Sequence, residues 1–226
     1  MDEGTMARIV ITGGNRGIGR ELARLYAAAG DEVVLGLRRS DVASGLPGEI
    51  LALDVSSDES VAAFAAALKG RTVDLLINNA GVIGPDRQST LDTDFAGFLE
   101  TLNINTLGPL RVTQALLGNL RQSGAAKVAI ISSLMGSLAH AKSDRVAYRA
   151  SKAAVNKVAQ ALATDLGAEG IAVAALHPGW VRTDMGGASA DISPGESARG
   201  VKAVIDDLSI AVTGRFWNYD ASPLPW

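Results

Sequence analysis

Short apolar segments alternate with helix-like segments along most of this 226-residue chain, and this alternation constrains the fold more than any single motif. Strands are expected at residues 9–12, 32–37, 49–54, 73–78, 127–132, 171–177 and 214–217, and helices at 20–29, 57–68, 94–122, 146–166 and 194–208. The helical stretch 94–122 contains Gly108 and Pro109, which are expected to interrupt it. Because the apolar runs are short and continuous, the strands should be covered by helices on both faces. The pattern therefore predicts an α/β protein with a doubly wound parallel sheet and right-handed crossovers.

A glycine-rich turn joins the first expected strand to the first expected helix. The strand 9–12 runs directly into Gly13-Gly14-Asn15-Arg16-Gly17-Ile18-Gly19. Small residues at such a turn let the backbone approach a pyrophosphate, which can then rest on the free N–H groups of the helix start. Three residues separate Gly13 from Gly17, unlike the common G-x-G-x-x-G spacing, so a purely structural turn stays open at this point.

Tyr148 and Lys152 stand four residues apart in the expected helix 146–166, and Ser132 and Ser133 precede them. The pKa of a free tyrosine hydroxyl is about 10, so proton exchange at neutral pH needs a fixed positive charge nearby. An i, i+4 spacing puts both side chains on one helix face and supplies that charge. Taken alone, the pair is also compatible with a chance arrangement on a surface helix.

Composition excludes several classes of function. The net charge of −3 argues against a nucleic-acid partner, because binding to a phosphate backbone needs a basic face. No cysteine is present and there are two histidines, His140 and His177, so we expect no disulfide framework, no thiol nucleophile and no metal site. The sequence shows no signal pattern and no long apolar span, which predicts a cytoplasmic protein without a membrane partner. Residues 1–5 precede a second methionine, Met6, and are interpreted as an extension or as an addition to the natural start.

The distinctive residues all follow the ends of expected strands. The glycine turn ends the first strand, Asn78-Asn79-Ala80-Gly81 ends the fourth, Ser132 and Ser133 end the fifth, and Pro178-Gly179 ends the sixth. In a doubly wound sheet, ligands bind beyond the carboxyl ends of the strands. We therefore expect one cleft that combines cofactor-binding and catalytic groups.

Taken together, these motifs resemble those of the short-chain dehydrogenase/reductase family. The resemblance rests on the glycine turn, Asn78 to Gly81, Asn105-Thr106-Leu107-Gly108, Ser133, Tyr148 with Lys152, and Pro178-Gly179 with Val181 and Thr183. The stretch 177–187 and the ending Leu224-Pro225-Trp226 are similar to C-factor-like and sniffer-like carbonyl reductases. The resemblance implies a single-domain Rossmann-type sheet over residues 1–226 with strand order 3-2-1-4-5-6-7. It also implies an oxidoreductase that transfers hydride between a nicotinamide cofactor and a small carbonyl or secondary-alcohol substrate.

The resemblance assigns catalytic roles to four residues. Tyr148 would act as the general acid or base, Lys152 would lower the pKa of its hydroxyl and hold the nicotinamide ribose, and Ser133 would donate to the substrate oxygen. Ser133 is preferred to Ser132 because neighbouring side chains at a strand end point to opposite faces. Asn105 would hold a water that links Lys152 to solvent. Without the family, an asparagine that satisfies backbone freed by Pro109 is the competing interpretation.

Cofactor preference can be argued from the end of the second strand. An NAD-preferring fold places an acidic residue there, whereas this chain has Leu37 followed by Arg38 and Arg39. A guanidinium matches a phosphate group, so Arg38 with Arg16 predicts a 2′-phosphate and hence NADP(H), while NAD(H) stays open. By resemblance, the cofactor-binding residues are Gly13, Asn15, Arg16, Gly17, Ile18, Gly19, Arg38, Asp54, Val55, Asn79, Ala80, Gly81, Tyr148, Lys152, Pro178, Gly179, Val181 and Thr183.

Other readings stay open at this stage. A cofactor-binding signalling or redox-sensor protein is the main alternative, although the intact Asn105, Ser133, Tyr148 and Lys152 set weighs against it. A nucleotide-sugar epimerase is disfavoured by the chain length and the glycine spacing. Few residues separate Thr183 from the helix at 194, which predicts an open site, with residues 140–145 as its other wall. Relatives pair through the helices that carry Asn105 and Tyr148, so a homodimer or homotetramer is expected.

Overall fold

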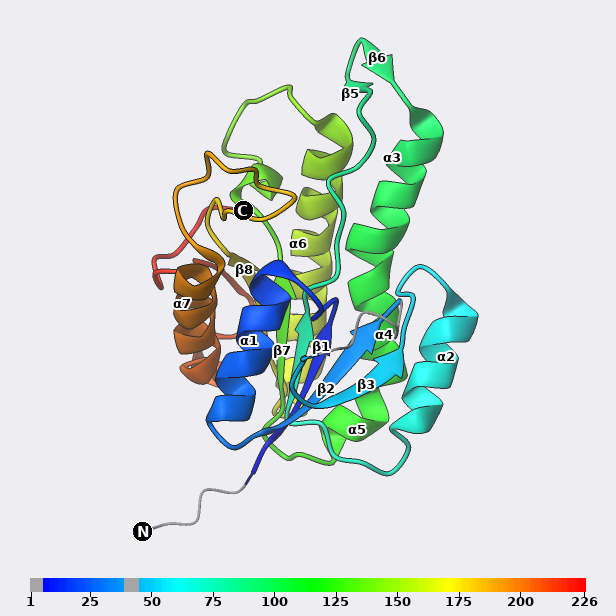
Figure 1. Ribbon diagram of the computed structural model, residues 1–226, viewed down its shortest axis with the longest axis vertical. Coiled ribbons are helices and arrows are strands. Elements are labelled where there is room, and N and C mark those ends of the chain that lie inside the picture. The colour runs from blue at the N-terminus through cyan, green and yellow to red at the C-terminus, as the bar shows by residue number, and fades with distance from the viewer. Residues whose placement is uncertain (1–5, 39–44) are drawn as a thin grey trace.

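The computed structural model describes residues 6–38 and 45–226. The proposed extension at residues 1–5 and Arg39 lie outside the described residues. Seven strands form one parallel sheet in the order β3-β2-β1-β4-β7-β8-β9 (Figure 1). Their bounds are β1 (Arg8–Thr12), β2 (Glu32–Leu37), β3 (Glu49–Ala52), β4 (Leu75–Asn78), β7 (Lys127–Ile131), β8 (Ala172–His177) and β9 (Arg215–Asn218). The expected α/β class and doubly wound sheet are confirmed. The expected strand order is confirmed as well, because β7, β8 and β9 are the fifth, sixth and seventh strands of this sheet, while β5 and β6 form a separate pair.

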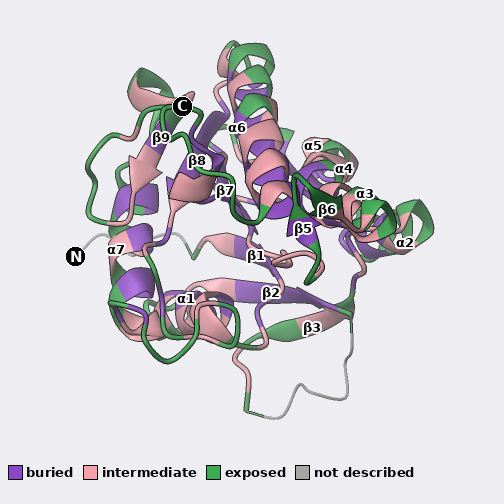
Figure 2. Cartoon of the chain, turned by 90° about the horizontal axis from the view of Figure 1, so that it is seen from above, coloured by how far each residue is buried: buried purple, intermediate pink, exposed green. Residues whose placement is uncertain are grey.

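Helices cover both faces of this sheet. One face carries α1 (Gly17–Ala28) and α7 (Pro194–Asp206), and the other carries α2 (Asp58–Ala67), α3 (Phe95–Leu102), α4 (Gly108–Ala115), α5 (Leu117–Arg121) and α6 (Val146–Gly167), as Figure 2 shows. Successive side chains of β1 point to opposite faces of the sheet. Val10 packs in the core on the α6 side, whereas Ile9 and Ile11 pack in the core under α1 and α7. Two buried cores therefore hold the sheet rigidly, and the site is built at the strand ends.

The segment 94–122 contains three helices and a wider turn instead of one interrupted helix. Between α3 and α4 the chain makes a π-helical turn, Asn103–Leu107, in which the N–H of Gly108 donates to the Asn103 carbonyl five residues earlier. Pro109 then stands in the first turn of α4, and because it has no N–H it donates no helical bond to the turn before it. The expected interruption is thus present, and its consequence is to place Asn105 within the π-helical turn.

Some small elements were not expected from the sequence. They are the hairpin β5 (Gln88–Ser89) and β6 (Asp92–Thr93), and the 3-10 turns η3 (Leu134–Gly136) and η4 (Ile210–Val212). The hairpin lies between β4 and α3, near the N-terminal end of α6 (Figure 1). Its position matters for the site, because it brings Gln88 against the start of the helix that carries Tyr148.

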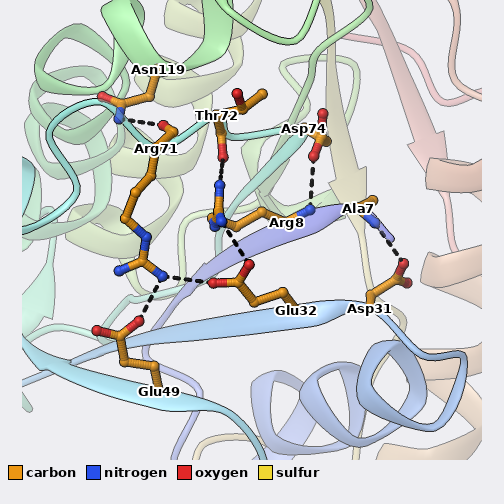
Figure 3. Close-up of polar contacts among 9 residues, drawn as sticks. All are labelled: Ala7, Arg8, Asp31, Glu32, Glu49, Arg71, Thr72, Asp74 and Asn119. Atoms are coloured by element: carbon orange, nitrogen blue, oxygen red, sulfur yellow. Dashed lines mark hydrogen bonds and ion pairs between the residues drawn. The ribbon is translucent and has the colours of Figure 1, made fainter. Parts of the chain in front are cut away.

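A network of charged residues joins the amino ends of the central strands. The guanidinium of Arg8 lies 2.7 Å from Glu32, and that of Arg71 lies 2.7 Å from both Glu32 and Glu49 (Figure 3). The Asp74 carboxylate accepts the N–H of Arg8 at 2.7 Å. These partly buried ion pairs link β1, β2 and β3 at the edge of the sheet opposite the glycine turn.

Candidate active site

A cleft of about 950 Å³ opens at the carboxyl ends of the strands, where the sequence predicted the functional residues to meet. Sixteen of the predicted site residues line it: Gly13, Asn15, Arg16, Gly17, Ile18, Gly19, Arg38, Asp54, Val55, Asn79, Ala80, Gly81, Tyr148, Lys152, Pro178 and Thr183. The cleft also has lining residues that the sequence analysis did not select, including Val82, Ile104, Arg182 and Met185. These lie next to predicted residues in the chain, so proximity to the motifs was the available signal.

The glycine turn packs against the segment that follows β4. The side-chain amide of Asn79 donates to the carbonyls of Thr12 and Gly13, each at 3.0 Å, and the Thr12 hydroxyl accepts the N–H groups of Asn79 and Ala80. A Cβ on Gly13 would lie 3.0 Å from the Ala80 Cα, and one on Gly19 would lie 2.5 Å from the Asn79 amide nitrogen. Gly13 also has a φ of +71°, which favours glycine. Only glycine therefore allows this close packing.

This cradle fits the pyrophosphate of a dinucleotide. Arg16 is the N-cap of α1 and makes no side-chain capping bond, so no side chain of its own covers the N–H groups of the first turn. An anion resting on those groups would satisfy them, and the absent glycine side chains leave room for it. The residues present in the cleft are thus suited to the cofactor that the family motifs imply.

The end of the cleft beside β2 carries the Arg38 guanidinium and the carboxylate of Asp54. Arg38 follows β2 and is exposed, and the buried Leu37 occupies the strand end where an acid would mark NAD preference. Asp54 accepts the Ser56 hydroxyl at 2.6 Å and its N–H at 2.9 Å. The Ser56 hydroxyl bond is the largest cause that holds the pKa of Asp54 below its usual range, and Arg38 acts in the same direction.

The side chain of Asn105 forms hydrogen bonds with the loop after β4 and not with the backbone near Pro109. Its amide nitrogen donates to the Val82 carbonyl at 2.8 Å, and its amide oxygen accepts the Val82 N–H at 2.8 Å. The same nitrogen donates to the Ser151 hydroxyl of α6 at 3.0 Å. A Cβ on Gly81 would lie 3.1 Å from the Asn105 oxygen and 3.7 Å from the Lys152 ammonium, so both groups border the backbone of Gly81. This arrangement removes the competing interpretation based on Pro109.

Tyr148 and Lys152 line the inner wall of the cleft, whereas the predicted catalytic residues Ser133 and Asn105 are not among its lining residues. Burial raises the pKa of the Tyr148 hydroxyl, and its hydrogen bond to Ser133 and the nearby Arg145 cation act against that rise. The Lys152 ammonium lies 5.7 Å from the centre of the Tyr148 ring and donates to the Ile131 carbonyl at 2.8 Å. Burial lowers the pKa of Lys152 to about 8. The expected lowering of the Tyr148 pKa by Lys152 stays a prediction.

The two neighbouring serines have different partners. Ser133 acts to lower the pKa of the Tyr148 hydroxyl and accepts the N–H of Met135 at 3.1 Å. Ser132 instead donates to the Asn156 amide oxygen at 2.5 Å, within the core side of α6. Ser132, and not the preferred Ser133, is among the residues that line the cleft, whereas Ser133 is the serine that acts on the pKa of the Tyr148 hydroxyl. The choice of Ser133 as the catalytic serine stays a prediction.

Gly179 and Val181 do not line the cleft, unlike the other residues predicted after β8. Val181 is buried and pairs with Ile192 in an isolated parallel bridge. A Cβ on Gly179, whose φ is +84°, would lie 2.6 Å from the Ile192 side chain. These two residues shape the wall from behind, whereas Pro178 and Thr183 face the cleft. The sequence motif alone could not tell which of these neighbouring residues line the cleft and which pack behind the lining residues.

A second cavity of about 590 Å³ adjoins the cleft and shares Asp184 and Met185 with it. Its remaining walls are the loop after β4 with Gln88 and Ser89, and the segment Ser143, Asp144 and Arg145 that precedes α6. Part of the predicted wall at residues 140–145 is therefore present. The cavity lies at the N-terminal end of α6, since Arg145 directly precedes that helix.

Fold and cleft together define a nicotinamide-dependent oxidoreductase. Residues 7–192 match the family model described as short chain dehydrogenase, and the chain belongs to that family. It is an NAD(P)-dependent oxidoreductase of the kind that acts on CH–OH and C=O groups. Within the described residues, no helix is both long and apolar enough to cross a membrane.

Two curated relatives and two solved structures illustrate the similarity. The C-signal of Myxococcus xanthus is 47% identical over 165 residues, which cover 73% of this chain and 99% of that protein. The 1-hydroxy-2-glutathionyl-2-methyl-3-butene dehydrogenase of Rhodococcus sp. (strain AD45) is 35% identical over 230 residues, covering 98% of this chain and 100% of that one. The carbonyl reductase Sniffer of D. melanogaster superposes with a TM-score of 0.89 at 30% identity, covering 98% of this chain and 100% of its own. The NADPH-bound carbonyl reductase from chicken fatty liver superposes with a TM-score of 0.89 at 31% identity, and the match covers 98% of this chain and 99% of that one.

Proposed function

We propose that this protein is an NADP(H)-dependent carbonyl reductase in which Tyr148 exchanges the proton. One observation carries the proposal: Tyr148, beside the buried Lys152, borders a dinucleotide-sized cleft. The NADPH-bound reductase from chicken fatty liver, which superposes closely, supports the cofactor. Small aldehydes, ketones and the corresponding secondary alcohols are the proposed substrates.

Charge at the adenosine end supports the preference for NADP(H) over NAD(H). Arg38 is exposed directly after β2, the last residue of that strand is Leu37 and not an acid, and Arg16 belongs to the glycine turn. Two guanidinium groups can donate charged hydrogen bonds to a 2′-phosphate, whereas their charge would add little to the binding of a ribose 2′-hydroxyl. We assign the pyrophosphate to the glycine turn, the adenine side to Asp54 and Val55, and the nicotinamide side to Tyr148, Lys152 and Thr183.

In the proposed reduction, the bound cofactor supplies a hydride to the carbonyl carbon. Tyr148 donates its hydroxyl proton to the carbonyl oxygen, and in alcohol oxidation its phenolate takes the proton back. Ser133 donates to the same oxygen as negative charge develops on it. Lys152 keeps a positive charge within reach of the phenolate, which favours the deprotonated form. Asn105 holds the loop at Val82 and the helix at Ser151, and so fixes the wall behind these groups.

A signalling role is the second candidate, because the C-signal relative is 47% identical over 165 residues. A protein that only binds cofactor would not need a proton donor. The two functions therefore differ in turnover: a reductase oxidises NADPH when a carbonyl is present, and a sensor binds it without consuming it.

We also propose a homodimer that pairs through α3. Phe95 and Leu99 are four residues apart on α3, so they share one helix face, and they have 75% and 69% of their surface exposed. Leu91, which is 96% exposed, lies in the turn of the hairpin β5–β6 just before this helix. Large apolar side chains are seldom exposed in such a row along one segment without a partner surface.

Titration with NADPH and NADH, followed by turnover on a panel of aldehydes, ketones and quinones, tests the function. Carbonyl-dependent oxidation of NADPH should occur, and Tyr148→Phe should abolish it while NADPH affinity stays nearly unchanged. Tyr26→Phe is the matched control, since the buried Tyr26 hydroxyl has no hydrogen-bond partner among the described residues. Unaltered turnover in Tyr148→Phe would exclude the proposed mechanism, and binding without turnover across the panel would favour the signalling role.

A further inference from the structure

The helix that carries Tyr148 begins without a local capping side chain. In α2, α3 and α7, the N-cap residues Ser57, Asp94 and Ser193 each accept the N–H three residues later. The N-cap of α6 is Arg145, whose side chain makes no such bond and whose φ of 51° lies in the left-handed region. An N–H in the first turn of a buried helix costs free energy if it has no acceptor. The start of α6 therefore has to find its acceptor elsewhere in the fold.

Gln88 provides that acceptor from a distant segment. The N–H of Tyr148, at the position that the local caps serve in the other helices, donates to the Gln88 amide oxygen at 3.1 Å. The amide nitrogen of Gln88 donates to the carbonyls of Ile83 and Pro85 at 3.0 and 2.7 Å. Gln88 keeps 7% of its surface exposed. One side chain thus joins the loop after β4 to the main chain of the catalytic tyrosine.

The same loop is held at its other end by Asn105. Asn105 bonds both main-chain groups of Val82 and reaches Ser151 in α6, and the Ser151 hydroxyl donates to the Tyr148 carbonyl at 2.7 Å. The two amides therefore fix Tyr148 from both sides, Gln88 at its N–H and Asn105 through Ser151 at its carbonyl. The second cavity is bounded by Gln88 and by the loop that it holds.

We propose that Gln88 is a positioning residue for the catalytic tyrosine: its side-chain amide sets the first turn of α6 against the loop after β4, and so sets the Tyr148 hydroxyl against Ser133. The proposal rests on the reductase function proposed above. Among the described residues, the hydrogen bonds of the Gln88 side chain are all to main-chain groups, so it acts on Tyr148 through the backbone. Its effect should appear in the rate of the chemical step and not in cofactor affinity.

Two variants separate the contacts of Gln88. Gln88→Met removes both the acceptor and the donor, and Gln88→Glu keeps an acceptor for Tyr148 but loses the donor to Ile83 and Pro85. Gln114→Met, on the exposed side of α4, is the matched control. For each variant, NADPH affinity, the thermal midpoint, kcat and KM for a carbonyl, and the pH dependence of alcohol oxidation are measured beside wild type and Tyr148→Phe.

We expect kcat of Gln88→Met to fall on the order of tenfold or more, because small displacements of a catalytic group cost that much. NADPH affinity and the Gln114→Met control should match wild type. The pH midpoint of alcohol oxidation should also move upward, since losing the Ser133 contact removes a bond that opposes the effect of burial on the Tyr148 pKa. Arg145 and Lys152, the charged groups beside Tyr148, are unchanged in these variants. A loss of stability alone would leave that midpoint in place.

Wild-type kcat and an unmoved pH midpoint in folded Gln88→Met would overturn the proposal. If Gln88→Met does not fold, Gln88→Glu decides: a lowered kcat at wild-type NADPH affinity supports the role, and wild-type kcat overturns it. If Tyr148→Phe retains turnover, the reductase mechanism fails and this proposal fails with it. If Tyr148→Phe is inactive while both Gln88 variants keep wild-type kcat, only the role of Gln88 fails.

Discussion

Arg16 and Asp184 form an ion pair across the cleft, with their side-chain nitrogen and oxygen 2.5 Å apart. Arg16 belongs to the glycine turn after β1, and Asp184 belongs to the segment after β8. Both side chains are mostly exposed, with 69% and 77% of their surface accessible, so the pair contributes little stability. We assign the Arg16 guanidinium to the 2′-phosphate. When the phosphate binds, Arg16 must therefore either bind both the phosphate and Asp184 or break its ion pair with Asp184.

Asp184→Asn should tighten NADPH binding by about two- to fivefold, because it releases Arg16 and removes a negative charge near the phosphate. NADH binding should change less, since it lacks the 2′-phosphate. Titration of both cofactors at low and high salt measures the effect, with the exposed Asp165→Asn on α6 as control. Equal changes for the two cofactors would contradict the assignment of Arg16.

Arg38→Asp should weaken NADPH binding by about tenfold or more and leave NADH binding unchanged or slightly tighter. The substitution exchanges a phosphate-binding cation for the carboxylate that NAD-preferring folds place after the second strand. Lys69→Asp, an exposed charge reversal beyond the end of α2, controls for net charge. The outcome against this role would be an equal loss of affinity for both cofactors.

Leu99→Glu should convert the proposed homodimer to a monomer, because it places a charge in the exposed row of Leu91, Phe95 and Leu99. Light scattering coupled to size exclusion gives the mass of each species. Leu138→Glu is the control, since Leu138 is 84% exposed but belongs to another segment. A wild-type protein that is already monomeric at micromolar concentration would refute the dimer.

Most of the fold followed from patterns that local physics determines. The buried strands, the glycine turn and the i, i+4 spacing of Tyr148 and Lys152 depend on short stretches of sequence, and they were predicted with their order. Gln88 was missed because its role depends on three main-chain partners, one of them sixty residues away, which no local pattern reveals. Val181 and Gly179 were expected in the cleft because a sequence motif does not show which of its residues face the cleft and which pack behind it. The π-helical turn at Asn105 also needed tertiary contacts.

His177→Gln should make the protein more resistant to acid. Burial lowers the pKa of His177 to about 4, and its Nδ1 atom is buried without a partner among the described residues. Above the unfolded pKa of about 6.5 the ring is neutral in both states, so it affects stability little. As the pH falls from 6.5 to about 4, the unfolded chain gains a proton that the folded one does not, and stability falls by a few kcal/mol at most. Denaturant unfolding at pH 7 and pH 4.5 measures this difference, with the exposed His140→Gln as control. An equal acid sensitivity in wild type and His177→Gln would rule out His177 as its source.

Lys152→Met should abolish turnover and yet stabilise the fold at neutral pH. Burial lowers the pKa of Lys152 from 10.5 to about 8, so the folded state bears an ammonium whose burial costs about 3 kcal/mol below that pH. Methionine removes this cost but leaves the Ile131 carbonyl without its donor, so a net gain of about 1–2 kcal/mol is expected. The penalty disappears as the pH rises from about 8 to 10.5, because the folded lysine becomes neutral before the unfolded one. Unfolding of both proteins at pH 7 and pH 10 should therefore show the variant as the more stable protein at pH 7 and wild type as the more stable one at pH 10, where the lost contact to Ile131 outweighs the remaining penalty. A variant that is less stable than wild type at pH 7 would mean that the lysine contacts outweigh the cost of burying its charge.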